Sequence, residues 1–123
     1  MELFESSQNY LKRIVILEKE LGKDKVHAID VANAMSFSRA SVSVAMHRLE
    51  EAGYIEFGPD KELILTKAGR YEGERIYERH EVLTKAFIDL GVNPKTAYDD
   101  ACAVEHDLSE ETYQAFKNKY GDK

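Results

Sequence analysis

The stretch of sequence that decides the fold spans residues 36–66 and reads SFSRASVSVAMHRLEEAGYIEFGPDKELILT. Apolar residues recur at three- and four-residue intervals from Val42 to Ala52, which predicts an amphipathic helix. The Ser38 hydroxyl is placed to cap the first turn of this helix, because it can accept a hydrogen bond from a free backbone amide. Gly53 can supply the left-handed residue that follows the last turn.

A β-hairpin is expected directly after this helix. The runs 54–57 and 62–66 are rich in apolar residues, and the turn 58–61 between them holds a proline at its second position. Upstream, the apolar residues of 28–35 predict a short helix, which residues 36–38 separate from the longer one. A short helix, a tight turn, a longer helix and a hairpin together make a winged helix-turn-helix.

Further helices are expected on both sides of this motif. Apolar spacing predicts a first helix over 6–21. Thr66 is suited to cap a long helix that runs to about Leu90. Pro94 is suited to begin the next helix, and Ser109 is suited to cap the last one. The predicted fold class is therefore mainly α: an N-terminal winged helix-turn-helix with a two-stranded wing, followed by a helical domain.

Composition narrows the functional classes. The chain has 123 residues and a net charge of −6, with one cysteine, which excludes an intrachain disulfide. No apolar run is long enough for a membrane span, and the N-terminus lacks a leader segment, so a cytoplasmic location is expected. Residues 1–70 hold 10 Lys and Arg against 11 Asp and Glu, whereas residues 71–123 hold 7 against 12. The acidic second half suits a cation as ligand, and the near-neutral first half leaves room for a basic face.

The helix after Ser38 carries a polar face that suits DNA. Small hydroxyl side chains and arginines let a helix lie in the major groove, where they bond phosphates or base edges. An ordinary solvated surface helix is the alternative interpretation. The residues expected to contact DNA are Ser38, Arg39, Ala40, Ser41, Ser43, His47, Arg48 and, in the wing, Lys61.

The strongest chemical signal is a possible metal site. Cys102, Glu105 and His106 share one face if they lie on a helix, so a thiolate, a carboxylate and an imidazole would converge. This mixture suits Fe(II), Co(II), Ni(II) or Zn(II) better than Mg(II) or Ca(II). His80 lies in step with the apolar positions of the long helix and is a fourth candidate ligand. The alternative is a buried cysteine beside a surface Glu–His pair, with His80 as a core residue.

The whole chain resembles the diphtheria toxin repressor family of metal-dependent transcriptional regulators. The resemblance rests on five stretches: QNYL at 8–11, SVS at 41–43, LTKAG at 65–69, ERH at 78–80 and DACAVEHDLS at 100–109. It implies a repressor that binds a palindromic DNA operator as a homodimer when loaded with a divalent metal, and that controls metal-homeostasis genes. It also implies a short form without the SH3-like domain, and neither a membrane nor a small-molecule substrate as partner. The expected domains are a winged helix-turn-helix DNA-binding domain, 1–71, and a helical dimerisation and metal-binding domain, 72–123.

The resemblance also implies a ligand set. Cys102, Glu105 and His106 match the family's metal site in its iron-type form, and His80 matches a second ligand. Asn9 falls where the first helix of the family contributes a methionine or an aspartate, and its amide oxygen is a weaker ligand than a carboxylate. Since Asn9 belongs to the DNA-binding half, a bound ion would act as a clip between the two halves.

Three positions depart from the family pattern by losing a ligand. Lys12 stands where manganese-type members have a bridging glutamate, Thr84 where many have an acid, and Tyr98 where iron-type members have an ancillary histidine. One strong site is therefore expected rather than a two-metal centre. Because thiolate is a poor partner for Mn(II), Fe(II) is favoured, with Mn(II), Co(II), Ni(II) or Zn(II) possible.

Three other functions compete with this interpretation. One is a winged-helix regulator that has lost metal control. Another is an enzyme with Cys102 as nucleophile and His106 as base, but no glycine-rich or oxyanion loop adjoins the cysteine, so we expect no enzyme. The third is a protein-interaction module without a DNA role. For the homodimer, Leu83 and Phe87 and the faces of the last two helices are expected to form the contact.

Overall fold

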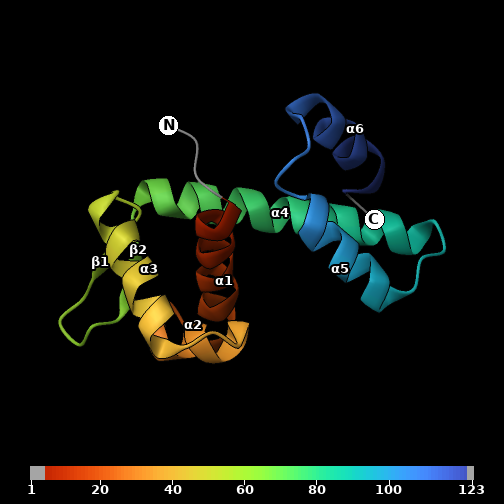
Figure 1. Ribbon diagram of the computed structural model, residues 1–123. Coiled ribbons are helices and arrows are strands. Elements are labelled where there is room, and N and C mark those ends of the chain that lie inside the picture. The colour runs from red at the N-terminus through yellow and green to blue at the C-terminus, as the bar shows by residue number, and fades with distance from the viewer. Residues whose placement is uncertain (1–4, 122–123) are drawn as a thin grey trace. The chain divides into compact units, whose positions relative to one another are not determined.

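The computed structural model describes residues 5–121. The predicted fold class, mainly α with a two-stranded wing, is confirmed (Figure 1). Residues 1–4, part of the N-terminus in which no leader was expected, lie outside the described residues. The boundary between the two compact units falls between Glu74 and Arg75. The elements are α1 (Glu5–Leu21), α2 (Ala28–Met35), α3 (Arg39–Glu51), β1 (Ile55–Phe57), β2 (Leu63–Leu65), α4 (Lys67–Asp89), α5 (Pro94–Val104) and α6 (Glu110–Tyr120).

The helix-turn-helix of the first unit consists of α2 and α3. Ser36 follows α2 in the left-handed conformation, with φ 59°, and reverses the chain direction between the two helices. Ser38 caps α3 as predicted, because its Oγ accepts a hydrogen bond from the Ser41 amide at 3.1 Å. Gly53 adopts φ +87° just beyond α3, also as predicted. Val42, Met46 and Leu49 form the buried face of α3.

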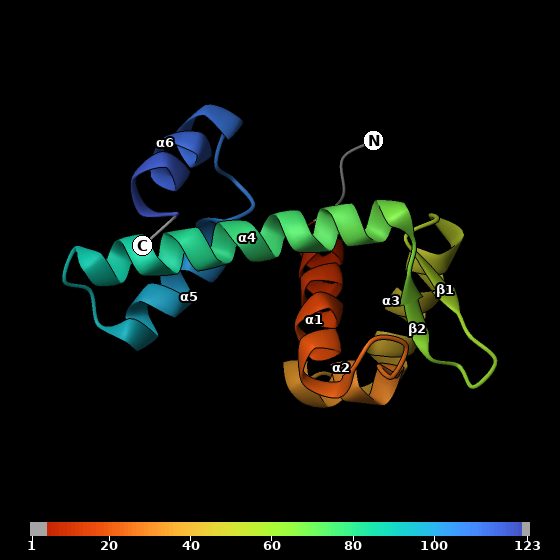
Figure 2. The ribbon, with the colours of Figure 1, turned by 180° about the vertical axis from the view of Figure 1, so that it is seen from behind.

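The wing is the antiparallel pair of β1 and β2, in which Ile55 pairs with Leu65. Its turn is closed by a hydrogen bond from the Lys61 amide to the Gly58 carbonyl at 3.0 Å. The Leu63 amide of β2 donates to the Val26 carbonyl at 2.7 Å, so the wing is also tied to the segment before α2. Figure 2 shows the wing beside α3 from behind. The wing and the helix-turn-helix are thus one packed body.

The start of α4 is fixed to this body. Thr66 caps α4 by accepting from the Gly69 amide at 3.1 Å, and its hydroxyl donates to the Gly53 carbonyl at 2.7 Å. A Cβ at Gly69 would lie 1.9 Å from the Tyr54 carbonyl oxygen, so only glycine allows this close approach. One turn further on, Arg70 forms a two-pronged ion pair with Glu18 of α1, at 3.0 and 3.2 Å.

The second unit consists of the remainder of α4 with α5 and α6. Asn93 caps α5, and Ser109 caps α6 by accepting from the Thr112 amide at 3.1 Å. The helix ends at Val104, so Glu105 is the C-cap residue and His106 lies in the turn beyond it. This differs from the expectation that a single helix carries all three ligands of the 102–106 stretch. The Glu105 amide still bonds the Ala101 carbonyl at 3.0 Å, which keeps Glu105 on the face of Cys102.

One of the residues expected at the dimer surface, Leu83, is buried inside the single chain, and this corrects the expectation for that residue. Leu83 is only 1% exposed within the single chain, so it belongs to the core. Phe87 is half-buried and packs edge-on against Phe116, with ring centroids 6.5 Å apart. The exposed large apolar side chains of this unit are instead Ile88, Leu90, Tyr98 and Val104.

Among the described helices, none combines the length and the apolar character that crossing a bilayer requires.

Candidate metal centre and nucleic-acid interface

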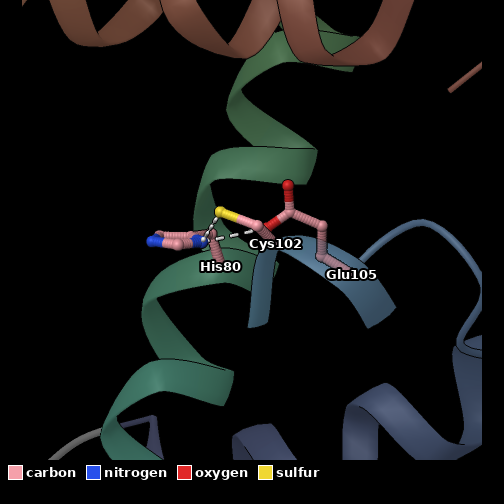
Figure 3. A group of neighbouring side chains, drawn as sticks. All are labelled: His80, Cys102 and Glu105. Atoms are coloured by element: carbon pink, nitrogen blue, oxygen red, sulfur yellow. Dashed lines mark hydrogen bonds and ion pairs between the residues drawn. The ribbon is translucent and has the colours of Figure 1, made fainter. Parts of the chain in front are cut away.

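Three predicted ligands come together in the second unit. His80 reaches from α4, Cys102 from α5 and Glu105 from the end of α5 (Figure 3). Their ligand atoms all lie within 4.8 Å of one another. The His80 Nδ1 atom is 3.0 Å from Glu105 Oε2 and 3.7 Å from Cys102 Sγ. One nitrogen, one sulfur and one carboxylate donor therefore face a single point, and this donor set fits a first-row transition ion.

Glu105 is the central residue of this cluster. Its side chain is fully buried, and its second oxygen, Oε1, lies 3.4 Å from Nε2 of His106. The carboxylate thus stands between two imidazoles, with His80 at one oxygen and His106 at the other. The side chain of His106 is 3% exposed. His106 is therefore adjacent to the three-donor cluster through Glu105, and its ligation of the same ion stays a prediction.

The electrostatics of the cluster favour a positive charge. Burial alone lowers the pKa of His80, but hydrogen bonds to Cys102 and Glu105, together with their negative charges, outweigh burial and raise the pKa to about 9. The same two partners that raise the affinity of His80 for a proton would attract a metal cation. The cluster therefore attracts a cation, which is either a proton on His80 or a metal ion.

Tyr98 and Thr84, the two residues of this unit that depart from the family pattern, both contact His80. The Tyr98 ring packs edge-on against the His80 ring, with centroids 4.5 Å apart. The Thr84 hydroxyl donates to the His80 backbone carbonyl at 2.8 Å. Neither supplies an anionic ligand: Tyr98 holds the imidazole ring in place and Thr84 bonds its own helix. The expectation of one metal site rather than two stays a prediction.

Asn9 and Lys12 lie on α1, in the first unit. Asn9 is half-buried, and Lys12 is 4% exposed. The participation of Asn9 in the metal site stays a prediction.

The predicted DNA-contacting residues lie on the surface of the first unit. All eight are exposed, on α3, at its cap or in the wing. The Ser38 and Ser41 hydroxyls bond each other at 2.9 Å at the helix start. Ser43, His47 and Lys61 line a hollow of about 610 Å³ between α3 and the wing, in which the His47 ring contacts the Phe57 ring with centroids 5.1 Å apart.

A second hollow on the other side of α3 contains residues that the sequence reasoning missed. It is lined by Ser41 and Arg48, and also by Val44 of α3 and by Ser6 and Ser7 of α1. Val44 is 52% exposed although it is apolar. The signal was available, because Val44 falls outside the spacing of the buried residues of α3. An exposed valine beside an arginine suits contact with a thymine methyl group.

Comparison with known proteins places this chain in a family. Residues 2–63 match the N-terminal DNA binding domain of iron dependent repressors, and residues 66–122 match their metal binding and dimerisation domain. The HTH-type transcriptional regulator MntR of Geobacillus thermodenitrificans is 34% identical over 104 residues, which cover 85% of this chain and 72% of that protein.

Solved structures share the fold. A manganese-dependent transcriptional repressor in complex with manganese superposes with a TM-score of 0.78 at 26% identity, over 94% of this chain and 52% of that chain. The IdeR protein of T. acidophilum gives a TM-score of 0.78 at 22% identity, over 98% of this chain and 55% of that one. This chain thus spans about half the length of these two proteins.

The two family matches, together with the winged helix, identify the chain as a metal-dependent transcriptional regulator. The chain belongs to the iron-dependent repressor family, which is the diphtheria toxin repressor family that its sequence motifs resemble. Members of this family are DNA-binding transcriptional repressors rather than enzymes.

Proposed function

We propose that this protein is a metal-activated repressor that binds a palindromic operator as a homodimer and controls genes of metal-ion homeostasis. The observation that carries the proposal is the convergence of the His80, Cys102 and Glu105 donor atoms within 4.8 Å, on a unit that follows a winged helix. The buried carboxylate and the neighbouring thiol are costly to place in a core unless a cation or proton compensates them.

The donor set sets the order of metal preference. His80, Cys102 and Glu105 would hold the ion, with His106 and Asn9 as further ligands. The sulfur donor favours Fe(II), and also accepts Co(II), Ni(II) or Zn(II), over Mn(II), which is the weakest binder of the series. When bound, the metal supplies a fixed positive charge and a common point of attachment for these ligands.

The ligands explain how metal binding would control DNA binding. Cys102 and Glu105 belong to the second unit, whereas Asn9 belongs to α1 of the first. With Asn9 as a further ligand, a bound ion would join the two units and limit the orientations that α3 samples. An ion that binds only the ordered arrangement shifts the population toward that arrangement. Two α3 helices of a dimer, about one turn of DNA apart, then contact two half-sites of a palindrome.

One observation favours a metal-independent regulator as the second candidate. Lys12 is a buried lysine of α1. It stands at the position where the family resemblance implies a bridging glutamate in manganese-type members. A lysine there removes an anionic ligand, which favours a regulator that has lost metal control.

The decisive experiment measures DNA binding against free metal. A preferred duplex is first selected from a random library, and its affinity is then titrated with Fe(II) and Mn(II) under anaerobic, reducing conditions. The matched variants are Cys102→Ala, which removes the thiolate, and Asn9→Asp, which adds a hard anionic ligand. We expect Cys102→Ala to abolish the metal stimulation without unfolding the protein, because a small side chain replaces another.

Asn9→Asp is expected to strengthen the response and to shift preference toward Mn(II). Three superimposable curves for the wild type and both variants would contradict metal control. If the wild type then still bound its selected duplex, the metal-independent regulator would be the better description.

A further inference from the structure

Arg79 is a buried charged residue whose guanidinium contacts the turn between α5 and α6. It is 4% exposed, and it immediately precedes His80 on α4. Its Nη1 atom donates to the backbone carbonyls of Leu108 at 2.8 Å and of Glu105 at 3.3 Å. Its Nη2 atom donates to Glu110 Oε2 at 2.9 Å. The planar group also lies over the Tyr113 ring, 4.9 Å from its centroid.

These contacts all fall on the turn and helix that follow Cys102. Since α5 ends at Val104, the carbonyls of Glu105 and Leu108 have no further helical turn to bond them. The Nη1 group of Arg79 donates to both carbonyls, and the planar guanidinium holds Nη1 at a fixed position relative to Nη2, which bonds Glu110. The same group is bonded to Glu110 and stacked on Tyr113, so it joins the turn to the first turns of α6.

Glu105 is therefore held at both of its ends by consecutive residues of α4. His80 bonds its carboxylate, and Arg79 bonds its backbone carbonyl. A side chain that serves as a metal ligand has a fixed direction only when its backbone is fixed as well. Because Glu105 lies just past the last residue of α5, helix hydrogen bonding alone does not fix its carbonyl end.

We propose that Arg79 is a positioning residue of the metal site: it holds the Glu105 turn against α6, so that the carboxylate of Glu105 faces His80 and Cys102. The inference rests on the proposed metal-binding function and adds a residue that supplies no ligand atom. It also makes α6 part of the metal site, through Glu110 and Tyr113. Loss of the fork geometry would leave the thiolate of Cys102 in place, since Cys102 lies within α5, but would release Glu105.

Co(II) is a suitable probe, because its absorption reports both the thiolate bond and the coordination geometry. The test compares Co(II) affinity and spectrum in the wild type and in Arg79→Lys, which keeps the charge but loses the two-pronged fork. We expect the affinity of Arg79→Lys to fall by about 10- to 100-fold. Its thiolate charge-transfer band should persist while its ligand-field bands change, because Cys102 stays and Glu105 moves.

Arg70→Lys is the matched control, because Arg70 also forms a two-pronged ion pair on α4, with Glu18 in the first unit. It should lower thermal stability and leave the Co(II) affinity and spectrum unchanged. If Arg79→Lys binds Co(II) with the affinity and spectrum of the wild type, Arg79 has only a structural role and the inference is wrong. A wild type without any thiolate band would instead contradict the metal site of the proposed function.

A second pair of variants decides the matter if Arg79→Lys does not fold. Glu110→Gln weakens the outer end of the Arg79 network, whereas Glu111→Gln changes the neighbouring acid of the same helix turn. We expect Glu110→Gln to lower Co(II) affinity about threefold, since an ionised acceptor is the stronger partner of a guanidinium, and Glu111→Gln to have no effect. Equal affinities for the two variants would overturn the inference.

Discussion

At the scale of single residues, the chemistry of the candidate metal centre depends on which group neutralises the buried carboxylate of Glu105. Glu105 is 0% exposed, and an unpaired carboxylate in that position would be strongly unfavourable. Its partner in the structure is the imidazole of His80 at 3.0 Å. Metal and proton therefore compete for the same group of atoms, and the pH determines which of them is favoured.

This competition predicts a pH-dependent metal affinity. The pKa of His80 is raised from 6.5 to about 9, so below pH 9 the metal must displace the proton of His80 before the nitrogen can bind it. We expect Co(II) affinity to rise by about tenfold per pH unit for each proton displaced, between pH 6.5 and about 9. Calorimetry in two buffers of different ionisation enthalpy measures the protons released.

The metal-free protein should respond to pH in the opposite direction. A group with a raised pKa stabilises the folded state fully below its unfolded value, and that contribution is lost as the pH rises through the folded value. Thermal unfolding of the metal-free form should therefore show a stability that declines from pH 6.5 toward 9. His80→Gln is the control, because it removes this titration. A metal affinity that is flat over the same range would contradict His80 as a ligand.

At the scale of helices and strands, the sequence was most informative where the signal is local. Ser38, Thr66 and Ser109 each cap the helix that follows, as predicted, because capping needs only a side-chain oxygen and an amide three residues away. The wing was predictable for the same reason, since a proline turn separates two short apolar runs. The convergence of Cys102 and Glu105 also followed from helical spacing.

Three features of the structure could not be predicted from the sequence, each for a different reason. The role of Arg79 depends on carbonyls 26 and 29 residues away, which no local pattern encodes. The end of α5 at Val104 was missed, because neither glycine nor proline marks it. Val44 could not be assigned for a different reason: the spacing of α3 separates it from the buried residues, but spacing does not distinguish a solvated valine from one that contacts DNA.

The recognition role of α3 is testable through its two arginines. Arg39 lies in its first turn and Arg48 in its last, and both are exposed. Arg39→Ala and Arg48→Ala should each weaken binding to the selected duplex by about 1–3 kcal/mol if the side chain contacts a base edge. Fluorescence anisotropy at a fixed salt concentration measures the loss.

The control for this prediction is Arg75→Ala, a change of the same kind on α4. It should have a smaller effect, because Arg75 lies outside the helix-turn-helix and the wing. Similar losses for all three variants would indicate a general charge effect, and α3 would then not be the recognition helix.

At the scale of the whole molecule, the two units differ in the surfaces that they present. The first exposes the polar face of α3, and the second has the larger excess of acids in the sequence. Apolar periodicity located the buried face of α4 correctly, but it did not distinguish contacts within the chain from contacts between chains. Leu83 satisfies the periodicity and is used internally. Exposure, which sequence spacing does not report, points to other residues as the proposed dimer contact.

Two of those residues, Ile88 and Leu90, lie in the last turn of α4 and just after it. Ile88 is 43% exposed and Leu90 is 67% exposed, and Ile88 lines a shallow hollow with Tyr120 of α6. Large apolar side chains in such positions are typical of association surfaces. We expect the wild type to sediment as a dimer at micromolar concentration, and Ile88→Glu and Leu90→Glu each to weaken the dimer by about 2 kcal/mol or more, roughly 30-fold in Kd.

The control is Tyr71→Glu, which places the same charge at another exposed apolar residue, one that belongs to the first unit. It should leave the dimer intact. The Ile88→Glu variant should also lose affinity for a duplex with two half-sites while keeping its affinity for a single half-site, because the two copies of α3 then no longer bind as one body. A monomeric wild type would contradict the homodimer, and a dimer that survives both Ile88→Glu and Leu90→Glu would place the contact elsewhere on the second unit.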